Sequence, residues 1–283
     1  MTELLKGAAV AAAIAQRTTE TVAQLKEKGV EPTLGILRVG ERPDDLSYER
    51  GLVKRCEAVG VTVRKTVLAP DCTQSELMAA LDALNTDDTV HGILVFLPLP
   101  EHLDSEAVRA ALRPEKDVDG VTEGSLAGVF TASGRGFAPC TAQAVTEILD
   151  FYGVDCKGKN AVVLGRSLVV GRPAAMLLLH KNATVTICHR STEEQEKIAK
   201  AADILVVCIG QQESVGKDFL REGQTVIDVG IHWSDEKQKL CGDVRWDEAD
   251  GLVAAATPVP GGVGSVTSAV LADHVAEAAR RLA

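Results

Sequence analysis

The sequence predicts an α/β protein with two domains, and three observations support this fold class. First, a chain of 283 residues is too long for one small core and suits one large α/β unit or two ordinary domains. Second, short apolar runs rich in β-branched residues alternate with helical patterns, as in parallel sheets with crossover helices. Third, glycine, proline and serine gather in the segment TASGRGFAPCT, which begins at Thr131 and lies between two such series.

Seven apolar runs predict strands, and the amphipathic segments around them predict eight helices. The expected strands are residues 33–39, 62–68, 91–99, 160–165, 183–189, 203–210 and 224–230. The expected helices lie near residues 8–28, 46–59, 73–85, 104–112, 141–152, 170–181, 193–201 and 267–282. We expect one domain of residues 1–138 plus 268–283, to which the last helix returns, and a second of residues 139–267.

Composition limits the function classes. A formal charge of −10 argues against a nucleic-acid or anionic-membrane surface, because phosphate contacts need a basic face and no basic cluster occurs here. The alanine-rich N-terminus, MTELLKGAAVAAAIAQRTTE, is too short and too broken for a membrane span and predicts an amphipathic helix of a cytoplasmic protein. These features favour a small-molecule ligand.

The seven cysteines are odd in number and scattered, without a CxxC pair. They indicate neither a disulfide framework nor a zinc site, and no other metal site is expected. Most are expected in the core. Cys140 either lines a pocket or fills the core, and no histidine is paired with it in sequence.

The segment VVLGRSLVVGRPAAMLLLH, residues 162–180, has features of a dinucleotide-binding turn. A buried strand is expected to end at Gly165, Ser167 lies in the turn, and Gly171 precedes a helix. Glycine lets the backbone approach a pyrophosphate, and a helix N-terminus offers free N–H groups. The spacing GxSxxxG departs from GxGxxG, so an ordinary tight turn is an alternative. We interpret this half as a Rossmann-like, doubly wound nucleotide domain.

The end of the next strand favours NADP over NAD. An NAD enzyme usually carries an acid here for the ribose hydroxyl, whereas this strand ends in HRST. Arg166 and Arg190 could pair with a 2′-phosphate, although both could also be solvated surface residues. Two later strands end in glycine, where a nicotinamide would lie. The expected cofactor-binding residues are Gly165, Arg166, Ser167, Gly171, His189, Arg190, Ser191, Thr192, Gly210, Gly230 and Ile231.

Three further stretches, VFLPLP (95–100), PEKDVDGV (114–121) and ATPVPGGVGSVTSAVL (256–271), place proline or glycine at element ends. Together with the GRSxxVGxP turn, they resemble the bifunctional methylenetetrahydrofolate dehydrogenase/methenyltetrahydrofolate cyclohydrolase family. The resemblance covers most of the chain. It implies tetrahydrofolate substrates, a pterin site in a cleft between two domains, and a homodimer formed through the nucleotide domain.

The resemblance also implies roles for individual residues. Tyr48 matches a tyrosine that stacks on the substrate, and Asp119, the second acid of KDVDG, matches a carboxylate that binds the pterin. A turn-forming role before Gly120 is the alternative for Asp119. We expect Tyr48 and Asp119 to be the catalytic residues. The expected substrate-binding residues are Tyr48, Val95, Leu97, Pro98, Asp119, Pro260, Gly261 and Gly262.

Two positions depart from the family pattern. The family places a lysine one helical turn after the tyrosine and a glutamine in a VQLPLP strand end, and these two residues serve the hydrolytic step. Leu52 and Phe96 occupy these positions here, and neither side chain can titrate or form a hydrogen bond. Nearby, Lys54 projects to a different face of the helix, and arginine, as at Arg55, is a poor general base.

The leading hypothesis is an NADP-dependent methylenetetrahydrofolate dehydrogenase in one-carbon metabolism whose cyclohydrolase activity is weak or absent. A second hypothesis keeps both activities, with water activated by a group that the sequence does not reveal. A third is a folate- or nucleotide-binding protein without catalysis, which the intact phosphate-binding turn disfavours. An unrelated Rossmann dehydrogenase is disfavoured by KDVDG and PGGVG together.

Overall fold

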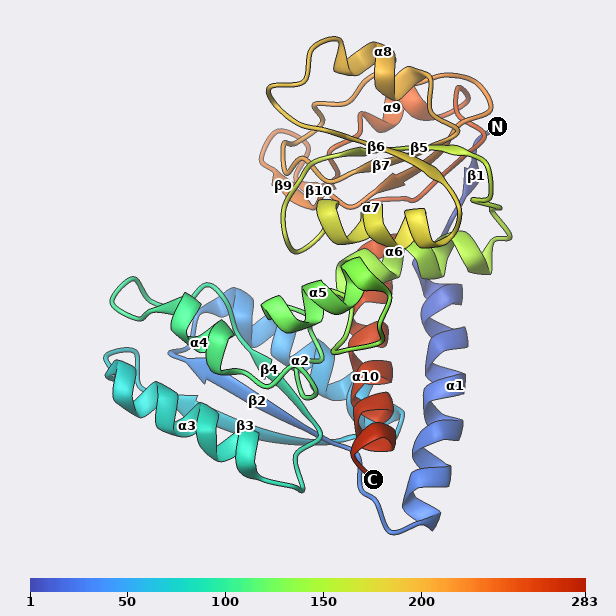
Figure 1. Cartoon of the computed structure of the whole chain (residues 1–283). Helices are drawn as coiled ribbons and strands as arrows, with labels where there is room; N and C mark the ends of the chain where they lie inside the picture. The colour runs from blue at the N-terminus through green and yellow to red at the C-terminus, as the bar shows by residue number, and fades with distance from the viewer. The chain divides into compact units, whose positions relative to one another are not determined.

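The computed structural model describes residues 1–283 and divides into two compact units. The three-stranded unit comprises residues 12–140 and 268–283, and the six-stranded unit comprises residues 1–11 and 141–267. Each unit has its own parallel sheet (Figure 1). The α/β prediction with two domains is therefore confirmed.

The sheet of the three-stranded unit has the order β3-β2-β4, and both pairings are parallel. Its strands are β2 (Thr33–Val39), β3 (Thr62–Leu68) and β4 (Gly92–Val95). Its helices are α2 (Pro43–Ala58), α3 (Gln74–Thr86), α4 (Ser105–Ala111), α5 (Glu123–Thr131) and most of α1 (Gly7–Glu27) and α10 (Val263–Leu282). The central strand β2 is buried along its whole length, as an apolar run between two neighbours predicts.

Helix α3 illustrates how the sequence determines this unit. Thr73 caps the helix by accepting from the Glu76 backbone N–H, while the Glu76 side chain accepts from the Thr73 backbone N–H. The reciprocal bonds satisfy two donors that a helix start leaves free. Leu77, Leu81 and Leu84, at helical spacing, are buried and pack in a core shared with β2 and β4.

The sheet of the six-stranded unit has the order β1-β11-β8-β7-β5-β6, and all pairings are parallel. Its strands are β1 (Glu3–Leu4), β5 (Asn160–Leu164), β6 (Thr184–Cys188), β7 (Ile204–Val207), β8 (Thr225–Asp228) and β11 (Ala255–Ala256). The unit also contains α6 (Cys140–Phe151), α7 (Gly171–His180), α8 (Gln195–Lys200), α9 (Trp246–Ala249) and an antiparallel hairpin of β9 (His232–Ser234) and β10 (Lys239–Cys241).

The six-stranded sheet is doubly wound. The chain passes from β5 to β6 on one side and then to β7 on the other, so β5 and β7 flank the point where the winding direction reverses. Figure 1 shows α7 on one face of this sheet and α8 and α9 on the other. In such folds, ligands bind beyond the carboxyl ends of the strands at this reversal. The Rossmann-like prediction is thus confirmed, and it directs attention to the residues that follow Leu164 and Val207.

The expected strands and helices all occur, with differences at their ends and several additions. The run at 91–99 forms a strand only from Gly92 to Val95. Phe96 N still donates to the Leu37 carbonyl at 3.0 Å, but Pro98 and Pro100 have no N–H with which to continue the pairing. The expected assignment of residues 1–11 to the first domain differs from the structure, because β1 pairs with β11 in the other unit. Helices α5 and α9 and the strands β1, β9, β10 and β11 were not expected; most of them are short.

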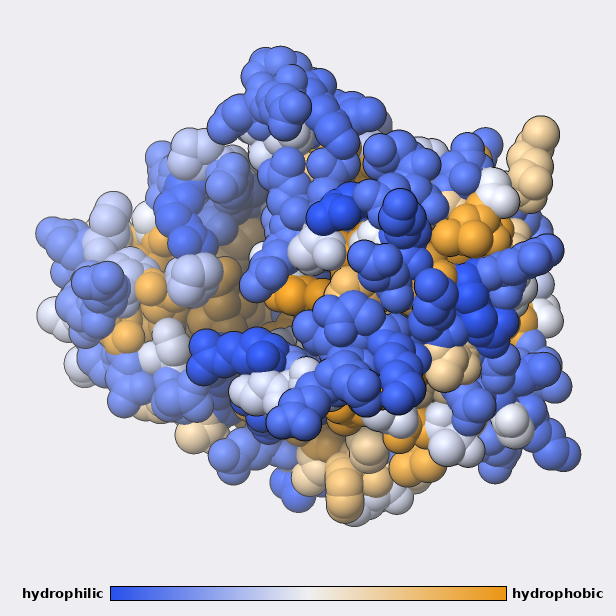
Figure 2. All heavy atoms as spheres, turned by 90° about the horizontal axis from the view of Figure 1, so that it is seen from above, coloured by the Kyte–Doolittle hydropathy of each residue, from blue (hydrophilic) through white to orange (hydrophobic).

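None of the helices is long and apolar enough to cross a bilayer. Figure 2 shows hydrophilic residues over most of the visible face, with hydrophobic residues in separate patches.

Candidate active site

Helix α2 presents Tyr48 at the surface while the next residue anchors the helix inside. The carboxylate of Glu49 is buried and accepts from Arg38 Nε at 2.9 Å and Lys65 Nζ at 2.7 Å. Because a buried carboxylate is costly unless it is paired, this ion pair network holds α2 against β2 and β3. Tyr48 is 41% exposed, so part of this residue is accessible to solvent.

Leu52 and Phe96 are apolar, buried neighbours of this tyrosine. Leu52 lies one turn after Tyr48 on α2 and is only 1% exposed, and Phe96 is 7% exposed. The rings of Tyr48 and Phe96 meet edge to face, with centroids 5.9 Å apart. Side chains that could accept or donate a proton are thus absent from both positions. Lys54 is exposed to solvent, and Arg55 has a buried Nε without a hydrogen-bond partner.

The two acids of KDVDG have different environments. Asp117 is fully buried, and its carboxylate accepts from Val121 N at 3.0 Å, Thr122 N at 2.8 Å and Ser125 Oγ at 2.6 Å. These donors belong to the following turn and to α5, so Asp117 organises the loop.

Asp119 is partly buried, and its carboxyl group has a raised pKa. Burial raises its pKa to about 7, the negative charge of Asp117 adds to the rise, and a hydrogen bond with the Cys140 thiol opposes it. Loss of solvation and then the charge of Asp119 raise the pKa of the Tyr48 phenol, so this hydroxyl stays protonated at neutral pH. Tyr48 and Asp119 therefore lie within electrostatic reach of each other in the same unit.

Cys140 and His274 support the turn that carries Asp119. His274 Nδ1 donates to the Val118 carbonyl at 2.8 Å, and the Cys140 thiol donates to the same oxygen at 3.2 Å. Sγ and Nδ1 are 3.6 Å apart. Because Nδ1 already uses its proton for Val118, it cannot take the proton of Cys140, and burial raises the pKa of that thiol. The arrangement thus positions a loop and is no nucleophile–base pair.

Sequence reasoning missed His274, because 134 positions separate it from Cys140 and no local pattern connects them.

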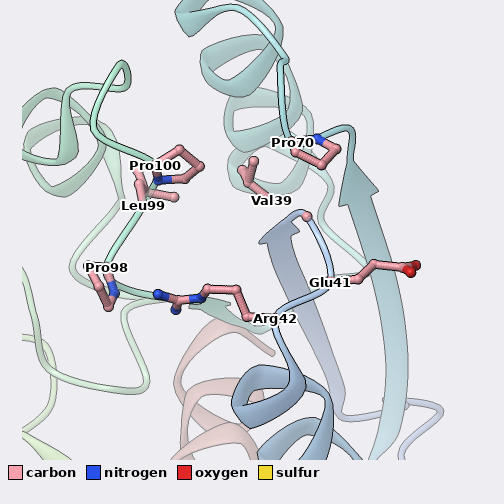
Figure 3. Close-up of a pocket in the computed structure, with 8 residues that line it drawn as sticks. Val39, Glu41, Arg42, Pro70, Pro98, Leu99 and Pro100 are labelled. Carbon is pink, nitrogen blue, oxygen red and sulfur yellow. The ribbon is translucent and has the colours of Figure 1, made fainter.

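A cavity of about 320 Å³ adjoins the carboxyl ends of the three-stranded sheet (Figure 3). In Figure 3 the Arg42 side chain extends toward Pro98, whereas Glu41 points away. Arg42 is held by Asp45, whose carboxylate accepts from its Nε at 2.8 Å. Pro98, an expected substrate residue, therefore lines this cavity. The lining residues are Val39, Gly40, Glu41, Arg42, Pro70, Pro98, Leu99 and Pro100.

The expected nucleotide turn lies at the winding reversal of the six-stranded sheet. Gly165 has φ +126°, and a Cβ on it would come within 2.4 Å of the Cys208 carbonyl oxygen, beyond the end of β7. A Cβ on Gly171 would come within 2.2 Å of the Gly165 carbonyl oxygen. Ser167 Oγ accepts from Val170 N at 3.1 Å just before α7. The glycines thus permit the close backbone packing that a dinucleotide turn requires.

Arg166 and Arg190 lie beyond two paired strands. Leu164, at the end of β5, pairs with Cys188, at the end of β6. Arg166 and Arg190 therefore follow at the same edge of the sheet, two residues after each end, and both are exposed without an ion-pair partner. The turn after β6 is ordered by His189 and Thr192, since the backbone N–H of His189 donates to Thr192 Oγ1 at 2.9 Å. Ser191 is exposed in this turn.

Six of the remaining expected residues lie in the six-stranded unit. Gly210 follows β7, and Gly230 and Ile231 follow β8, so all three lie beyond the carboxyl edge; Ile231 is 61% exposed. Pro260 and Gly261 are exposed just before α10, while Gly262 is buried. Gly261 accepts a hydrogen bond from Gly7 N at 2.8 Å. Val95, Leu97, Pro98, Tyr48 and Asp119 lie in the other unit.

No cluster of three or more histidine, cysteine, aspartate or glutamate side chains is arranged to hold a metal ion.

Two family models match the chain. Residues 5–119 match the catalytic domain of tetrahydrofolate dehydrogenase/cyclohydrolase, and residues 139–283 match its NAD(P)-binding domain. The chain is 48% identical over 279 residues to the bifunctional protein FolD of Carboxydothermus hydrogenoformans, covering 98% of this chain and 97% of that protein.

Solved structures agree. The bifunctional enzyme FolD of Campylobacter jejuni superposes with a TM-score of 0.95 at 37% identity, covering 99% of both chains. A Trypanosoma brucei methylenetetrahydrofolate dehydrogenase-cyclohydrolase, solved with NADP cofactor and an inhibitor, gives a TM-score of 0.91 at 36% identity. That match covers 99% of this chain and 98% of the other.

Proposed function

Because the chain belongs to the tetrahydrofolate dehydrogenase/cyclohydrolase family, we propose that it oxidises 5,10-methylenetetrahydrofolate to 5,10-methenyltetrahydrofolate with NADP. We further propose that its cyclohydrolase activity is weak or absent. One observation carries the second statement: the side chains beside Tyr48 at positions 52 and 96 are a buried leucine and a buried phenylalanine. Tyr48 and Asp119 remain for binding, whereas positions 52 and 96 offer no group for proton transfer.

Tyr48 and Asp119 are the proposed substrate contacts in the three-stranded unit. The exposed ring of Tyr48 offers a face on which an aromatic portion of the folate stacks. The carboxylate of Asp119 accepts hydrogen bonds from the pterin amino group and an adjacent ring N–H, which are strong when the acceptor is charged. The remaining proposed substrate residues are Val95, Leu97, Pro98, Pro260, Gly261 and Gly262.

The residues beyond the six-stranded sheet fit NADP. Close packing at Gly165 and Gly171 brings the backbone and the start of α7 near a pyrophosphate, as a dinucleotide requires. Arg166 and Arg190 have no acid to neutralise them, which suits the 2′-phosphate of NADP better than the ribose hydroxyl of NAD. The 2′-phosphate would be lined by His189, Ser191 and Thr192. The nicotinamide end would be lined by Gly210, Gly230 and Ile231.

The dehydrogenase step depends chiefly on positioning. When bound, NADP supplies the acceptor for the hydride that leaves the methylene carbon. Tyr48 and Asp119 orient the folate, so no proton has to be removed by a protein side chain in this step. The raised pKa of the Tyr48 phenol keeps it protonated at neutral pH, so it offers no base for this step.

The hydrolytic step has other needs. Water must attack the methenyl carbon, and protons must move between that water and a folate nitrogen before the ring opens. Leu52 and Phe96 provide neither a titratable group nor a hydrogen bond for this purpose. We therefore expect methenyltetrahydrofolate to leave the enzyme as the product.

Purified protein should reduce NADP when methylenetetrahydrofolate is added, and it should reduce NAD more slowly. Added methenyltetrahydrofolate should decay at the enzyme-free rate. Absence of NADP reduction at high protein concentration would refute the dehydrogenase, whereas decay well above the spontaneous rate would refute the loss of cyclohydrolase.

A fully bifunctional enzyme is the second candidate. Relatives named as bifunctional FolD favour it, and Asp119, with a pKa of about 7, is a titratable group near the proposed substrate. In that case hydrolysis would follow the ionisation of Asp119, and substitution of Asp119 by asparagine would abolish it while substrate still binds.

We also propose a homodimer in the cytoplasm. Trp233 on β9 and Trp246 on α9 are 56% and 37% exposed, and exposed aromatic residues are enriched at protein interfaces. Seven unpaired cysteines suit a reducing compartment. Light scattering after size exclusion should give twice the chain mass of 29.9 kDa; a single-chain mass would contradict the dimer.

A further inference from the structure

Two buried carboxylates, Asp228 and Asp243, lie at the carboxyl edge of the six-stranded sheet and have no part in the function described so far. Asp228 is the last residue of β8, and Asp243 follows β10. Asp243 has no exposed surface, and Asp228 is 5% exposed. Because ionised groups are costly to bury, their hydrogen bonds indicate what they do.

Asp243 connects the ends of two neighbouring strands. Its Oδ2 accepts from the backbone N–H groups of Ile209 at 2.8 Å and Gly210 at 2.9 Å, both beyond β7. Its Oδ1 accepts from Nε2 of His232 at 2.7 Å, beyond β8. A single side chain thus holds the two loops at a fixed separation.

Asp228 holds Asp243 in place. Its Oδ1 accepts from Asp243 N at 3.1 Å and from Gly230 N at 2.9 Å, and its Oδ2 accepts from Val244 N at 3.0 Å. A Cβ on Gly230 would come within 2.4 Å of Asp243 Oδ1, so the loop packs directly on this carboxylate.

Ile231 lies between the two attachment points. Its neighbour Gly230 donates a backbone hydrogen bond to Asp228, and its other neighbour His232 donates a side-chain hydrogen bond to Asp243. Ile231 itself is 61% exposed. An exposed residue held on both sides by buried carboxylates has a fixed backbone at the edge where a nucleotide binds in this type of sheet.

We propose that Asp243 is a positioning residue that aligns the Ile209–Gly210 and Ile231–His232 loops with the nicotinamide end of the bound dinucleotide. This inference rests on the proposed function of the six-stranded unit. Asp243 touches neither the folate nor the cofactor in this account; it acts through the backbone that it holds. The proposal predicts that loosening this carboxylate impairs cofactor binding and hydride transfer, while the contacts of Tyr48 and Asp119 with the folate, in the other unit, are unaffected.

The chain offers a matched control at the opposite edge of the same sheet. Asp203 precedes β7, and its carboxylate accepts from Asn160 N at 3.0 Å and from Arg221 at 2.9 Å. It therefore also joins two strand ends, but at the amino edge, away from the proposed cofactor position. A role in stability alone would be shared by both acids, whereas a role in positioning belongs to Asp243.

The test compares Asp243→Ala, Asp243→Asn and Asp203→Ala with the unaltered full chain. Calorimetry measures the Kd for NADP without the folate, thermal unfolding measures stability, and steady-state kinetics separate kcat from the KM of each substrate. We expect Asp243→Ala to raise the Kd for NADP about 10-fold and to lower kcat, with the folate KM unchanged. Asp243→Asn should restore most of the affinity, because its amide oxygen can still accept from Ile209 and Gly210.

Asp203→Ala should lower the unfolding temperature without changing the Kd for NADP. The proposal would be overturned if Asp243→Ala bound NADP as tightly as the unaltered chain and only its thermal stability were reduced. If Asp243→Ala does not fold, His232→Phe removes only the hydrogen bond between His232 and Asp243. This variant should still weaken NADP binding about 3-fold. An unchanged affinity for NADP would overturn the proposal. If the unaltered chain binds no NADP, the proposed function itself fails.

Discussion

The two units of the molecule differ in how they fill the positions around their expected ligands. Beyond the six-stranded sheet, glycines leave the backbone open, two exposed arginines have no ion-pair partner, and buried carboxylates hold the neighbouring loops. In the three-stranded unit, Tyr48 and Asp119 remain available, but Leu52 and Phe96 next to Tyr48 belong to the apolar interior. The two positions beside Tyr48 are thus apolar, whereas the positions beyond the six-stranded sheet keep polar and open backbone groups.

The two reactions of the family place different chemical demands on an enzyme. Hydride transfer needs two ligands held in the right geometry, which aromatic stacking, a carboxylate and a nucleotide turn can supply. Hydrolysis needs proton transfer, for which apolar side chains are useless. A chain can therefore lose the second activity while its fold and first activity are kept.

The largest effect is expected at Asp119. Replacing it with alanine removes an acceptor of two charge-assisted hydrogen bonds, each worth about 1.5–3 kcal/mol. We expect kcat/KM for methylenetetrahydrofolate to fall about 10³-fold. The Kd for NADP, measured by calorimetry, should be unchanged, because the cofactor residues lie in the other unit. A comparable loss of NADP affinity would show that the two units do not act separately.

The double substitution Leu52→Lys and Phe96→Gln places polar side chains at the two apolar positions beside Tyr48. It supplies a titratable group and a hydrogen-bonding partner, so enzymatic hydrolysis of methenyltetrahydrofolate should rise about 10-fold or more above the unaltered chain. Leu52→Met with Phe96→Leu serves as the apolar control and should give no gain. Because Leu52 is buried, circular dichroism must verify that the lysine variant folds. A folded variant without gain would contradict our account of these positions.

A moderate effect is expected at Arg190. Alanine at this position removes one charged partner of the 2′-phosphate, so the KM for NADP should rise about 10- to 100-fold. The KM for NAD, which lacks that phosphate, should change by less than about 3-fold. Lys197→Ala, which removes an exposed lysine paired with Glu194, is the surface control. Equal losses with both cofactors would show that Arg190 does not recognise the phosphate.

The smallest effect concerns stability. The pKa of Asp119 is raised from 3.8 to about 7 on folding, so the folded chain binds more protons than the unfolded chain between these values. Stability from this group is therefore full at low pH and declines as pH rises toward 7. At about pH 8, Asp119→Asn should be more stable in urea unfolding by on the order of 1–3 kcal/mol, and at about pH 5 the gain should shrink. A pH-independent difference would contradict the raised pKa.

Local patterns predicted most of the fold. Apolar runs located all seven main strands, and two of them, β2 and β3, were predicted at their observed bounds. The strands β1 and β11 have two residues each, too few for a periodic pattern, and they exist because each pairs with a distant partner. Predicting them would have required the tertiary contacts of residues 1–11.

The candidate site was predictable where its residues lie in one motif. Gly165, Gly171, Arg166 and Arg190 follow strand ends, so their common edge could be inferred from a parallel sheet. The contact of Val118 with His274, and the hydrogen bonds of Asp243 to Ile209 and Gly210, join residues far apart in sequence. Such contacts leave no local periodicity, and buried polar residues of this kind become recognisable only in the folded chain.

The central claim is most directly tested by the stoichiometry of one reaction. Enzyme, NADP and methylenetetrahydrofolate are mixed, and NADPH, methenyltetrahydrofolate and formyltetrahydrofolate are quantified over time against an enzyme-free hydrolysis control. We predict one methenyltetrahydrofolate for each NADPH, with formyltetrahydrofolate forming only at the spontaneous rate. Formyltetrahydrofolate that keeps pace with NADPH while methenyltetrahydrofolate fails to accumulate would contradict our account of Leu52 and Phe96.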